Sequence, residues 1–373
     1  MAPSASVRLP MTLTVAIDVG PLAGRRTGIG HAVALLTEAL AARDDVELVP
    51  YLTSFRGHPA AGTRRLPIPA ALAHRLWANL DHPRVDRWLD VASVVHGTNY
   101  VVPPSRLARV VSVYDCWFLQ HPGRVHADVA RAGRVLRRAV TTGASVHTTS
   151  QATAQVLSEL FPAAPVHVVP LGAVPLDPPP AAPPIAELAG RPFVLAVATI
   201  EQRKNLPRLV AAFGAVAADR PDVALVLAGG DGDDRPSLDA AIDTLPGDIS
   251  ARVLLAGYVD ASARSWLVHH AHVLAYPSLD EGFGLPLLDA MQAGVPIVAS
   301  TAGSIPEVAG DAALYADPYD VDALAAALDR AIVDDGLRRA LIQAAPAQLG
   351  RFSWSRTAAE LVDVYRRAAG RSR

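Results

Sequence analysis

Short, almost continuously apolar segments recur along the chain, and most of them run into a polar or glycine-containing turn followed by a helical pattern. In the first half, residues 13–20 (LTVAIDVG) precede the helical pattern of residues 28–43. In the second half, residues 192–199 (PFVLAVAT) precede that of residues 201–218. Continuous apolar strands that alternate with helices are typical of parallel sheets built from βαβ units. We therefore predict an α/β protein with one parallel sheet in each half.

Nine further segments carry the same buried-strand pattern. They are residues 46–52, 93–97, 109–115, 145–150, 166–172, 224–230, 252–258, 272–278 and 296–300. In doubly wound sheets, ligands bind in the loops at the carboxyl ends of the strands. Polar residues that directly follow these segments are therefore the candidates for function.

A proline-rich segment at residues 175–192 divides the chain. So many prolines cannot continue a helix or a central strand, and we interpret the segment as an extended linker between domains. The charge balance also changes there, from 17 basic and 12 acidic side chains up to residue 180 to 17 and 24 after it. We predict an N-terminal domain over residues 1–178, a C-terminal domain over residues 179–354 and a closing helix over residues 355–373.

The composition excludes several classes of protein. A net charge of −2 argues against a nucleic-acid binder, and the 51% of hydrophobic residues against 19% charged exclude a disordered chain. Cys116 is the only cysteine, which excludes a disulfide framework and a cysteine-based metal cluster. No apolar run reaches the length of a membrane span, and the start lacks the apolar core of a signal peptide, with Met11 an alternative start. We expect a cytoplasmic protein.

The loop Asp280-Glu281-Gly282-Phe283-Gly284 follows the strand pattern of residues 272–278 and precedes a helix. Pro286 suits the first turn of that helix and Gly294 suits its C-terminal cap. A glycine loop at a helix N-terminus offers free N–H groups to a phosphate or a sugar oxygen. Glu281, and Asp289 on the second turn, are placed to bind sugar or ribose hydroxyls. The alternative is that Glu281 caps the helix and Asp289 is solvated.

A pair of cations, Arg203 and Lys204, follows the strand pattern of residues 192–199 and precedes Asn205 and a helix. Fixed cations stabilise the negative charge of a phosphate group, with Arg as a planar fork and Lys as a point charge. The alternative is a solvated pair, but the helix dipole disfavours cations at an N-terminus. Lys204 is also the only lysine among 34 basic residues. We therefore predict a phosphate-binding role.

Three candidate segments lie in the first half. Gly28 and Gly30 open a helix after the first strand, where backbone can approach a ligand, although GIGHAV is a poor dinucleotide fingerprint. Asp115 ends the strand pattern of residues 109–115 and is a candidate to orient a hydroxyl, with a turn-forming aspartate as the alternative. His96 and Asn99 lie at another strand end.

The stretch from Tyr276 to Thr301, together with GSIPEVAGDAALYADPYDVDALAAAL downstream, resembles the signature of glycosyltransferase family 4. The likeness extends from about Ile17 to Tyr365. It implies the GT-B fold, in which two Rossmann-like doubly wound domains face a central cleft and a C-terminal helix crosses back to the first domain. It also implies a retaining enzyme that needs no metal or cofactor, with an acceptor-binding first domain and a second domain that binds a nucleotide-sugar donor.

The resemblance assigns roles to individual residues. The implied catalytic residues are Arg203, Lys204, Glu281 and Asp115. The implied donor-binding residues are Gly28, Gly30, Thr199, Tyr258, Gly282, Phe283, Gly284, Leu285 and Asp289. The chain departs from the family pattern at Asp289, where a glutamate is usual, at Tyr114, where a histidine is usual, and at Ala198-Thr199, which stand where many members carry an arginine after a glycine.

Residues 96–104, which contain NYVVPP, resemble mannosyltransferase-like members and favour GDP-mannose as donor. The acceptor that the family resemblance implies is a hydroxyl of a glycan, a glycolipid or a small molecule. A sugar phosphorylase, a nucleotide-sugar epimerase and an inactive nucleotide-sugar-binding protein remain the alternatives, with a dehydrogenase more distant. We do not assign a metal site to His269, His270 and His272.

Arg131, Arg134 and Arg138 share one face of a predicted helix in the first half. We interpret this face as ordinary solvated surface. Peripheral contact of the N-terminal domain with anionic lipid, at the inner face of the membrane, is the alternative.

Overall fold

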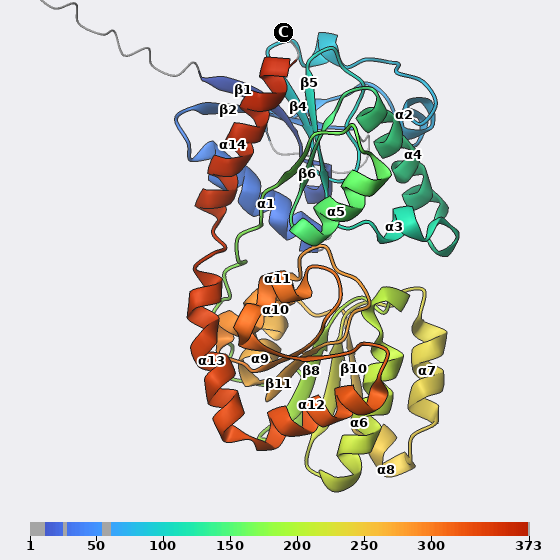
Figure 1. Ribbon diagram of the computed structural model, residues 1–373, viewed down its shortest axis with the longest axis vertical. Helices are drawn as coiled ribbons and strands as arrows, with labels where there is room; N and C mark the ends of the chain where they lie inside the picture. Colours follow the sequence, from blue (N-terminus) through green and yellow to red (C-terminus); the bar gives the residue numbers. More distant parts are fainter. Residues whose placement is uncertain (1–11, 25–27, 54–60, 372–373) are drawn as a thin grey trace, which may run out of the picture. The chain divides into compact units, whose positions relative to one another are not determined.

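The computed structural model describes residues 12–24, 28–53 and 61–371, which form two compact units (Figure 1). The first unit is the chain up to Gly172 together with the residues from Ser353 onward, and the second is Ala173–Phe352. Each unit is built around one parallel sheet with helices on both of its faces. Among the described residues, no helix is both long and apolar enough to span a bilayer.

The sheet of the first unit has, within the described residues, seven strands in the order β3-β2-β1-β4-β5-β6-β7. The strands are β1 (Leu13–Asp18), β2 (Val46–Leu52), β3 (Arg64–Arg65), β4 (Val94–Gly97), β5 (Ala108–Val113), β6 (Ser145–Thr148) and β7 (Val166–Val168). The helices are α1 (Gly28–Ala41), α2 (Ala70–Trp77), α3 (Trp117–Gln120), α4 (Ala127–Thr141), α5 (Gln151–Leu160) and α14 (Trp354–Arg371). Strand order reverses between β1 and β4, which is the switch point of a doubly wound sheet.

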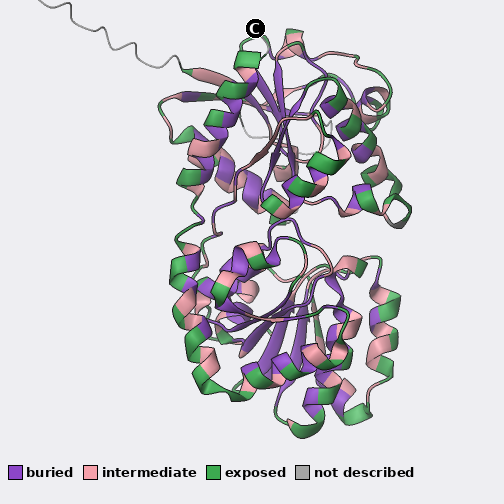
Figure 2. Cartoon of the chain, in the orientation of Figure 1, coloured by how far each residue is buried: buried purple, intermediate pink, exposed green. Residues whose placement is uncertain are grey.

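The C-terminal helix α14 belongs to the first unit, as predicted for a closing helix that returns to the first domain. It packs beside α1 on one face of the sheet, where Leu361 and Tyr365 are fully buried with Leu36 and Leu40. Truncating a fully buried leucine of this kind costs about 2–5 kcal/mol of folding free energy. Figure 2 shows that the central strands are buried along their whole length, which explains their continuous apolar pattern.

A chain of four hydrogen bonds runs through this core from α14 to the end of β7. Tyr365 Oη lies 2.8 Å from His96 Nδ1, His96 Nε2 lies 2.8 Å from Ser112 Oγ, and Ser112 Oγ lies 2.8 Å from His147 Nδ1. His147 Nε2 lies 3.1 Å from the Val169 carbonyl oxygen, which can only accept. His147 Nε2 therefore carries the proton, so Ser112 donates to Nδ1, His96 donates to Ser112, and Tyr365 donates to His96. We call these four side chains the relay. The directions of its hydrogen bonds give each imidazole one donor and one acceptor nitrogen, as in two neutral histidines.

The relay makes the first unit less stable in acid. Burial lowers the pKa of His147 to about 4, and burial together with the nearby His147 ring lowers that of His96 well below its ordinary value. Unfolded histidine titrates near about 6.5. Between about pH 6.5 and about pH 4 the unfolded chain therefore binds more protons than the folded chain, and stability falls as the pH falls through this window.

Replacing His147 by glutamine removes one of these titrations. At neutral pH, His147→Gln is expected to destabilise the unit by about 1–3 kcal/mol, because its buried partners lose their hydrogen bonds. The deficit should shrink by about 2 kcal/mol between about pH 7.5 and about pH 5. The deficit is measured by hydrogen–deuterium exchange of peptides from β4 to β6 in variant and wild type at each pH. This experiment reports the stability of the first unit alone.

Asp18 in the same unit also affects stability in this pH range, with the opposite sign, because burial raises its pKa to about 6 although the Gly20 N–H lowers it. Since Asp18 is present in both proteins, comparison of the variant with the wild type removes its contribution. The exposed His126 supplies the matched control His126→Gln, which leaves the buried relay intact. A deficit of His147→Gln that stays constant from neutral to acidic pH would contradict the neutral relay.

The sheet of the second unit has six strands in the order β10-β9-β8-β11-β12-β13. The strands are β8 (Phe193–Val197), β9 (Ala224–Ala228), β10 (Val253–Gly257), β11 (Val273–Tyr276), β12 (Ile297–Ser300) and β13 (Ala313–Ala316). The helices are α6 (Leu206–Asp219), α7 (Arg235–Asp243), α8 (Gly247–Ser250), α9 (Ala261–His270), α10 (Leu285–Ala293), α11 (Ile305–Ala309), α12 (Val321–Val333) and α13 (Asp335–Leu349). Here the strand order reverses between β8 and β11, so the loops that follow these two strands meet at the switch point.

The strand predictions are confirmed for all eleven segments, and two strands were missed. Both missed strands, β3 and β13, lie at sheet edges, where a strand needs neither length nor a continuous apolar run. The proline-rich segment at 175–192 is largely irregular, as its composition implies, but it belongs to the second unit and is not a free linker. A short 3-10 helix at Ala186–Leu188 anchors it there, because Leu188 is fully buried.

Candidate functional site

The turn after β8 is held in place by Asn205. Arg203 and Lys204 end a 3-10 helix, Gln202–Lys204, and Asn205 then adopts a left-handed conformation (φ 59°) that starts α6. Asparagine tolerates this conformation better than most residues. Its buried amide donates to the carbonyl oxygens of Pro277 at 3.0 Å and Pro318 at 2.8 Å. The turn after β8 is thereby tied to the loop that follows β11.

The loop after β11 brings Glu281 to the same place. Gly303, in the segment after β12, has a positive φ of 55°, and a Cβ there would lie 2.7 Å from the Glu281 carbonyl oxygen. Ser304 donates from its backbone N to that oxygen at 3.0 Å and from its hydroxyl to the Phe283 carbonyl at 3.1 Å. The glycine permits a close backbone approach that a larger residue would prevent, and the serine then fixes the shape of the loop.

Arg203, Lys204 and Glu281 form a buried ion cluster at the switch point. Arg203 Nη1 lies 2.9 Å from Glu281 Oε2, and Lys204 Nζ donates to Glu281 Oε1, which also accepts from Ser278 Oγ at 2.8 Å. Arg203 Nε bonds to the more exposed Glu201 at 3.0 Å. The exposed fractions of the three side chains are 20%, 11% and 7%. The alternative of a solvated pair for Arg203 and Lys204 is therefore wrong.

The electrostatics of the ion cluster favour an anionic ligand. Burial alone would raise the pKa of Glu281, but the charges of Lys204 and Arg203 outweigh it and lower that pKa to about 2. Burial and the neighbouring Arg203 lower the pKa of Lys204, while Glu281 raises it. We assign the lysine as the ammonium form because an ionised carboxylate accepts its hydrogen bond. Two cations then face one buried carboxylate. The second carboxylate, Glu201, is 39% exposed, so solvent screens its charge and the buried part of the cluster carries a net positive charge.

The start of α10 adds backbone donors to this positive site. Pro286 lies in the first turn and Gly294 caps the C-terminus with φ 67°, as predicted. The residue that caps the N-terminus is Gly284, with φ 103° and no side-chain hydrogen bond, so the alternative that Glu281 caps the helix is wrong. Pro286 has no N–H and the Leu287 N–H donates to the Gly284 carbonyl oxygen, so the backbone N–H groups of Gly284 and Leu285 are the ones placed to meet a phosphate or a sugar oxygen.

Asp289 lies on the second turn of α10 and is 1% exposed, so the alternative of a solvated side chain is wrong. Its Oδ2 accepts a hydrogen bond from Arg264 Nη2 of α9. Burial raises the pKa of Asp289 to about 6, against the opposing charge of Arg264. The other carboxylate oxygen, Oδ1, is buried and has no hydrogen-bond partner.

The remaining candidates of the second unit lie at the same edge of the sheet. Phe283 is buried against Phe352, with ring centroids 5.4 Å apart and planes nearly perpendicular. Thr199 is exposed in the turn after β8, and Tyr258 is 57% exposed after β10. Gly282 is buried in the loop, and Leu285 is the first residue of α10.

The candidates of the first unit do not join the ion cluster within one compact unit. Gly28 and Gly30 form the first turn of α1, and residues 25–27 of the same loop lie outside the described residues. Asp115 accepts from Tyr100 Oη at 3.0 Å and from the Trp117 backbone N at 3.2 Å, as a turn-forming aspartate would. His96, expected at a strand end, has its ring inside the relay.

Sequence reasoning missed three polar residues of these sites. Ser278 and Arg264 contact the two predicted carboxylates, and no local motif marks either of them. Asp18, at the carboxyl end of β1, accepts from the Gly20 backbone N at 2.9 Å and has a pKa raised to about 6 by burial. Its position at the end of the first strand was the available signal.

The residues that sequence reasoning discounted have structural partners. His269 and His270 bond to the carbonyl oxygens of Ser265 and Trp266, and His272 to that of Ile332. No group of three metal-ligating side chains occurs among the residues that the structure describes.

The arginines of α4 lie on its polar side. Arg131 pairs with Asp128 at 2.6 Å and Arg134 is exposed, whereas Arg138 is only partly exposed and its Nε is buried without a hydrogen-bond partner in the described part of the chain. The opposite side of the helix packs Val135, Leu136 and Ala139 into the core.

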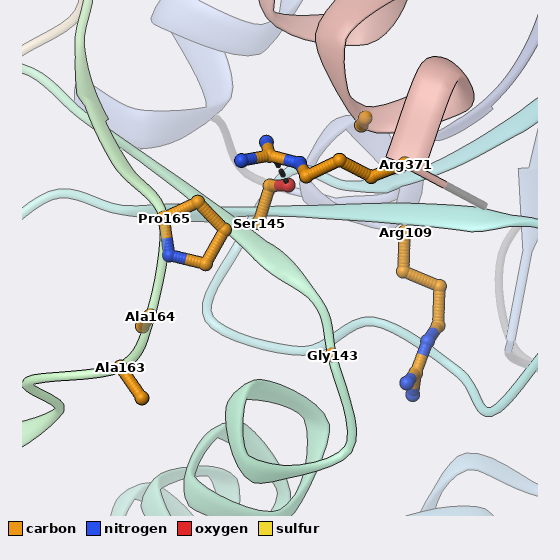
Figure 3. Close-up of a pocket in the computed structure, with 8 residues that line it drawn as sticks. Arg109, Gly143, Ser145, Ala163, Ala164, Pro165 and Arg371 are labelled. Carbon is orange, nitrogen blue, oxygen red and sulfur yellow. Dashed lines mark hydrogen bonds between the residues drawn. The ribbon is translucent and has the colours of Figure 1, made fainter.

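A pocket of about 380 Å³ lies in the first unit, at the opposite end of the sheet from the switch point. It opens where β5 and β6 begin, and Arg371 of α14 donates there to Ser145 Oγ at 3.1 Å (Figure 3). Arg109 is turned to Thr142, whose carbonyl oxygen lies 2.5 Å from Nη2. Because ligands of doubly wound sheets bind at the carboxyl ends of strands, we assign no part of the candidate site to this pocket.

Comparison with known proteins relates the second unit to sugar-transferring enzymes. Residues 182–348 match the family model described as "Glycosyl transferases group 1". Over 181 residues the chain is 35% identical to O-antigen chain mannosyltransferase B of Escherichia coli, covering 48% of this chain and 47% of that protein. Over 174 residues it is 32% identical to phosphatidyl-myo-inositol mannosyltransferase of Mycolicibacterium smegmatis, covering 46% of this chain and 43% of that protein. These matches span about half the length of the curated relatives.

Solved structures confirm the predicted fold, with two Rossmann-like doubly wound domains of the GT-B class. Sucrose-phosphate synthase from Thermosynechococcus elongatus superposes with a TM-score of 0.72 at 20% identity, over 95% of this chain and 98% of that one. WaaG, a glycosyltransferase involved in lipopolysaccharide biosynthesis, superposes with a TM-score of 0.70 at 16% identity, over 95% of this chain and 99% of that one. Anabaena HepE, solved with UDP and glucose, superposes with a TM-score of 0.70 at 17% identity, over 94% of this chain and 99% of that one. At these identities the likeness is one of fold.

Proposed function

We propose that the chain is a metal-independent, retaining glycosyltransferase of family 4. It would move a hexose from a nucleotide-diphosphate sugar to a hydroxyl of a glycan, a glycolipid or a small molecule. The observation that carries this proposal is the buried ion cluster of Arg203, Lys204 and Glu281 at the switch point of the second unit. The cluster also lies within the residues that match the glycosyl transferase family model.

The chemistry of the departing diphosphate explains the two cations. When the bond from the anomeric carbon to the phosphate oxygen breaks, its electron pair stays with the diphosphate, whose negative charge grows. The acceptor oxygen bonds to the anomeric carbon, and its proton passes to the released diphosphate. Arg203 and Lys204, already held by Glu281, stabilise that charge without reorganising, and the N–H groups at the start of α10 add to the effect. Fixed cations can do this work in place of a metal ion.

Glu281 would hold the cations and meet the sugar at once. A carboxylate has about four lone-pair sites, and Lys204 and Ser278 occupy both of those on Oε1. Arg203 bonds to Oε2 and the buried Tyr276 also hydrogen-bonds to this carboxylate, so a sugar hydroxyl would share Glu281 with these partners. Phe283, Gly284, Leu285 and Gly282 would contact the sugar and diphosphate, and Thr199 and Tyr258 would complete the donor site.

The donor we favour is GDP-mannose, because the curated relatives named above are mannosyltransferases. The UDP and glucose in HepE make UDP-glucose the donor to compare it with. In the first unit, Asp115 would orient the acceptor hydroxyl, and Gly28 and Gly30 would bring backbone close to the substrates. A cytoplasmic location, with contact of α4 with the inner face of a membrane as its alternative, stays part of the proposal.

Release of nucleoside diphosphate from GDP-mannose and UDP-glucose, with and without hydroxyl acceptors, tests this function. We expect release that depends on an acceptor and, by NMR of the product, the same anomeric configuration as in the donor. Full turnover with phosphate or without an acceptor would instead indicate a phosphorylase or an epimerase. Binding of the donor without transfer to any acceptor would indicate an inactive binding protein.

A further inference from the structure

Arg264 of α9 and Asp289 of α10 form an ion pair whose two members differ in exposure. The Asp289 side chain is 1% exposed and that of Arg264 is 22% exposed. The arginine therefore reaches inward from the surface and bonds to a carboxylate that solvent hardly touches. A buried carboxylate is costly unless its oxygens are hydrogen-bonded.

Only one oxygen of Asp289 is satisfied by the protein. Arg264 Nη2 donates to Oδ2, while Oδ1 is buried and has no partner among the described residues. An ionised carboxylate only accepts, so Oδ1 requires a donor. The pair stands one helical turn into α10, behind the N-terminus that lies beside the ion cluster. The hydroxyls of a ribose attached to a diphosphate at that N-terminus would be donors of the required kind.

We propose that Arg264 is a positioning residue of the donor site, which holds Asp289 so that its Oδ1 accepts a hydrogen bond from a ribose hydroxyl of the bound nucleotide. The inference rests on the proposed function of the second unit. Arg264 acts through Asp289 and need not touch the nucleotide. Because aspartate is one methylene shorter than glutamate, the orientation of its short side chain matters more, and an arginine on one oxygen leaves the other oxygen for the ligand.

The same pair makes binding sensitive to pH. Burial raises the pKa of Asp289 to about 6 even with Arg264 present, and Arg264 is the charge that opposes this rise. The titratable groups on the elements packed against α10 are Arg264, His269 and His270 of α9, Tyr276 of β11, Glu307 of α11, and Asp335, Arg338 and Arg339 of α13. Among them, Arg264 is the charge that lowers the pKa of Asp289, and Asp289 in turn helps to raise the pKa of Tyr276. Without Arg264 that pKa should rise further, and the carboxylate should be lost at a higher pH.

Isothermal titration with GDP, UDP and ADP, each compared with its 2′,3′-dideoxy form, tests the inference. For wild type near pH 7.5 we expect the best-bound ribonucleotide to bind about tenfold more tightly than its dideoxy form, as for one hydrogen bond to a charged group. Arg264→Met should reduce this preference to about twofold or less, and the pH below which the preference disappears should move above the wild-type value of about 6. Arg264→Lys, which keeps the charge, should restore most of the preference.

The matched control is Arg220→Met, which removes a half-exposed ion pair with Asp329 at the far end of α6. It should leave both the preference and its pH dependence unchanged. A ribose preference in Arg264→Met equal to that of wild type at every pH overturns the inference while the proposed function stands. If the wild type binds none of GDP, UDP and ADP, the proposed function is overturned, and the inference with it.

Discussion

Replacing Lys204 by methionine is expected to lower the rate of sugar transfer at saturating donor by about 10²–10³-fold, the usual effect of losing one preorganised charge partner of the transition state. Lys204 is 9% exposed as a residue, and its ammonium is held by Glu281 and lies 5.7 Å from the centre of the Tyr276 ring. Its charge is therefore fixed before the diphosphate leaves. Release of nucleoside diphosphate at saturating donor and acceptor measures the effect.

Lys204→Arg is the sharper companion variant, because it keeps the charge and changes the shape. The guanidinium is planar and larger than an ammonium and does not fit the same buried position, so we expect about a tenfold loss. Normal turnover by Lys204→Met would contradict the role of the lysine in stabilising the diphosphate. Normal turnover by Lys204→Arg alone would mean that charge matters there and that the only lysine of the chain survived by accident.

Replacing Glu281 by glutamine is expected to abolish transfer and also to destabilise the second unit by about 3–5 kcal/mol. Glu281 is buried between two cations, and removal of one charge from such a cluster leaves the others buried without compensation. The loss of activity should therefore come with a lower unfolding temperature. Calorimetric unfolding, together with the transfer assay at a temperature where the variant is folded, separates the two effects.

The double variant Lys204→Met with Glu281→Gln separates charge balance from chemistry. Because it removes one cation together with the carboxylate, much of the lost stability should return, as expected for buried pairs that are replaced together. Transfer should stay abolished. A Glu281→Gln protein with wild-type stability and turnover would contradict both the burial argument and the assigned role. Recovery of activity in the double variant would show that Glu281 serves only to neutralise Lys204.

The fold was largely predictable because the parallel strands are buried on both faces and carry continuous apolar runs. The two missed strands show the limit of that signal, since the two residues of β3 and the half-buried β13 need no such run at a sheet edge. The proline-rich segment was placed in a linker because composition reports the absence of regular structure. It does not report the burial of Leu188, which joins the segment to the second unit.

The candidate site was predictable residue by residue but not as a set of contacts. Motifs singled out Lys204 and Glu281, yet their hydrogen bond joins positions 77 residues apart, and periodicity says nothing of such pairs. Nothing in the sequence marks Arg264, because an arginine on a helix is ordinarily solvated. The hydrogen bond of the relay between Tyr365 and His96 joins positions 269 residues apart, and periodicity says nothing of such a pair either.

In the proposed function, the ion cluster of the second unit binds the diphosphate of a nucleotide sugar. The most direct measurement is a thermal-shift panel of GDP-, UDP-, ADP- and dTDP-sugars on the wild type and on Arg203→Met, because a ligand that binds only the folded chain raises its melting temperature. We expect at least one of the four to raise the melting temperature of the wild type, and the same ligand to have little effect on Arg203→Met. No shift with any of the four, or equal shifts in both proteins, would contradict the account.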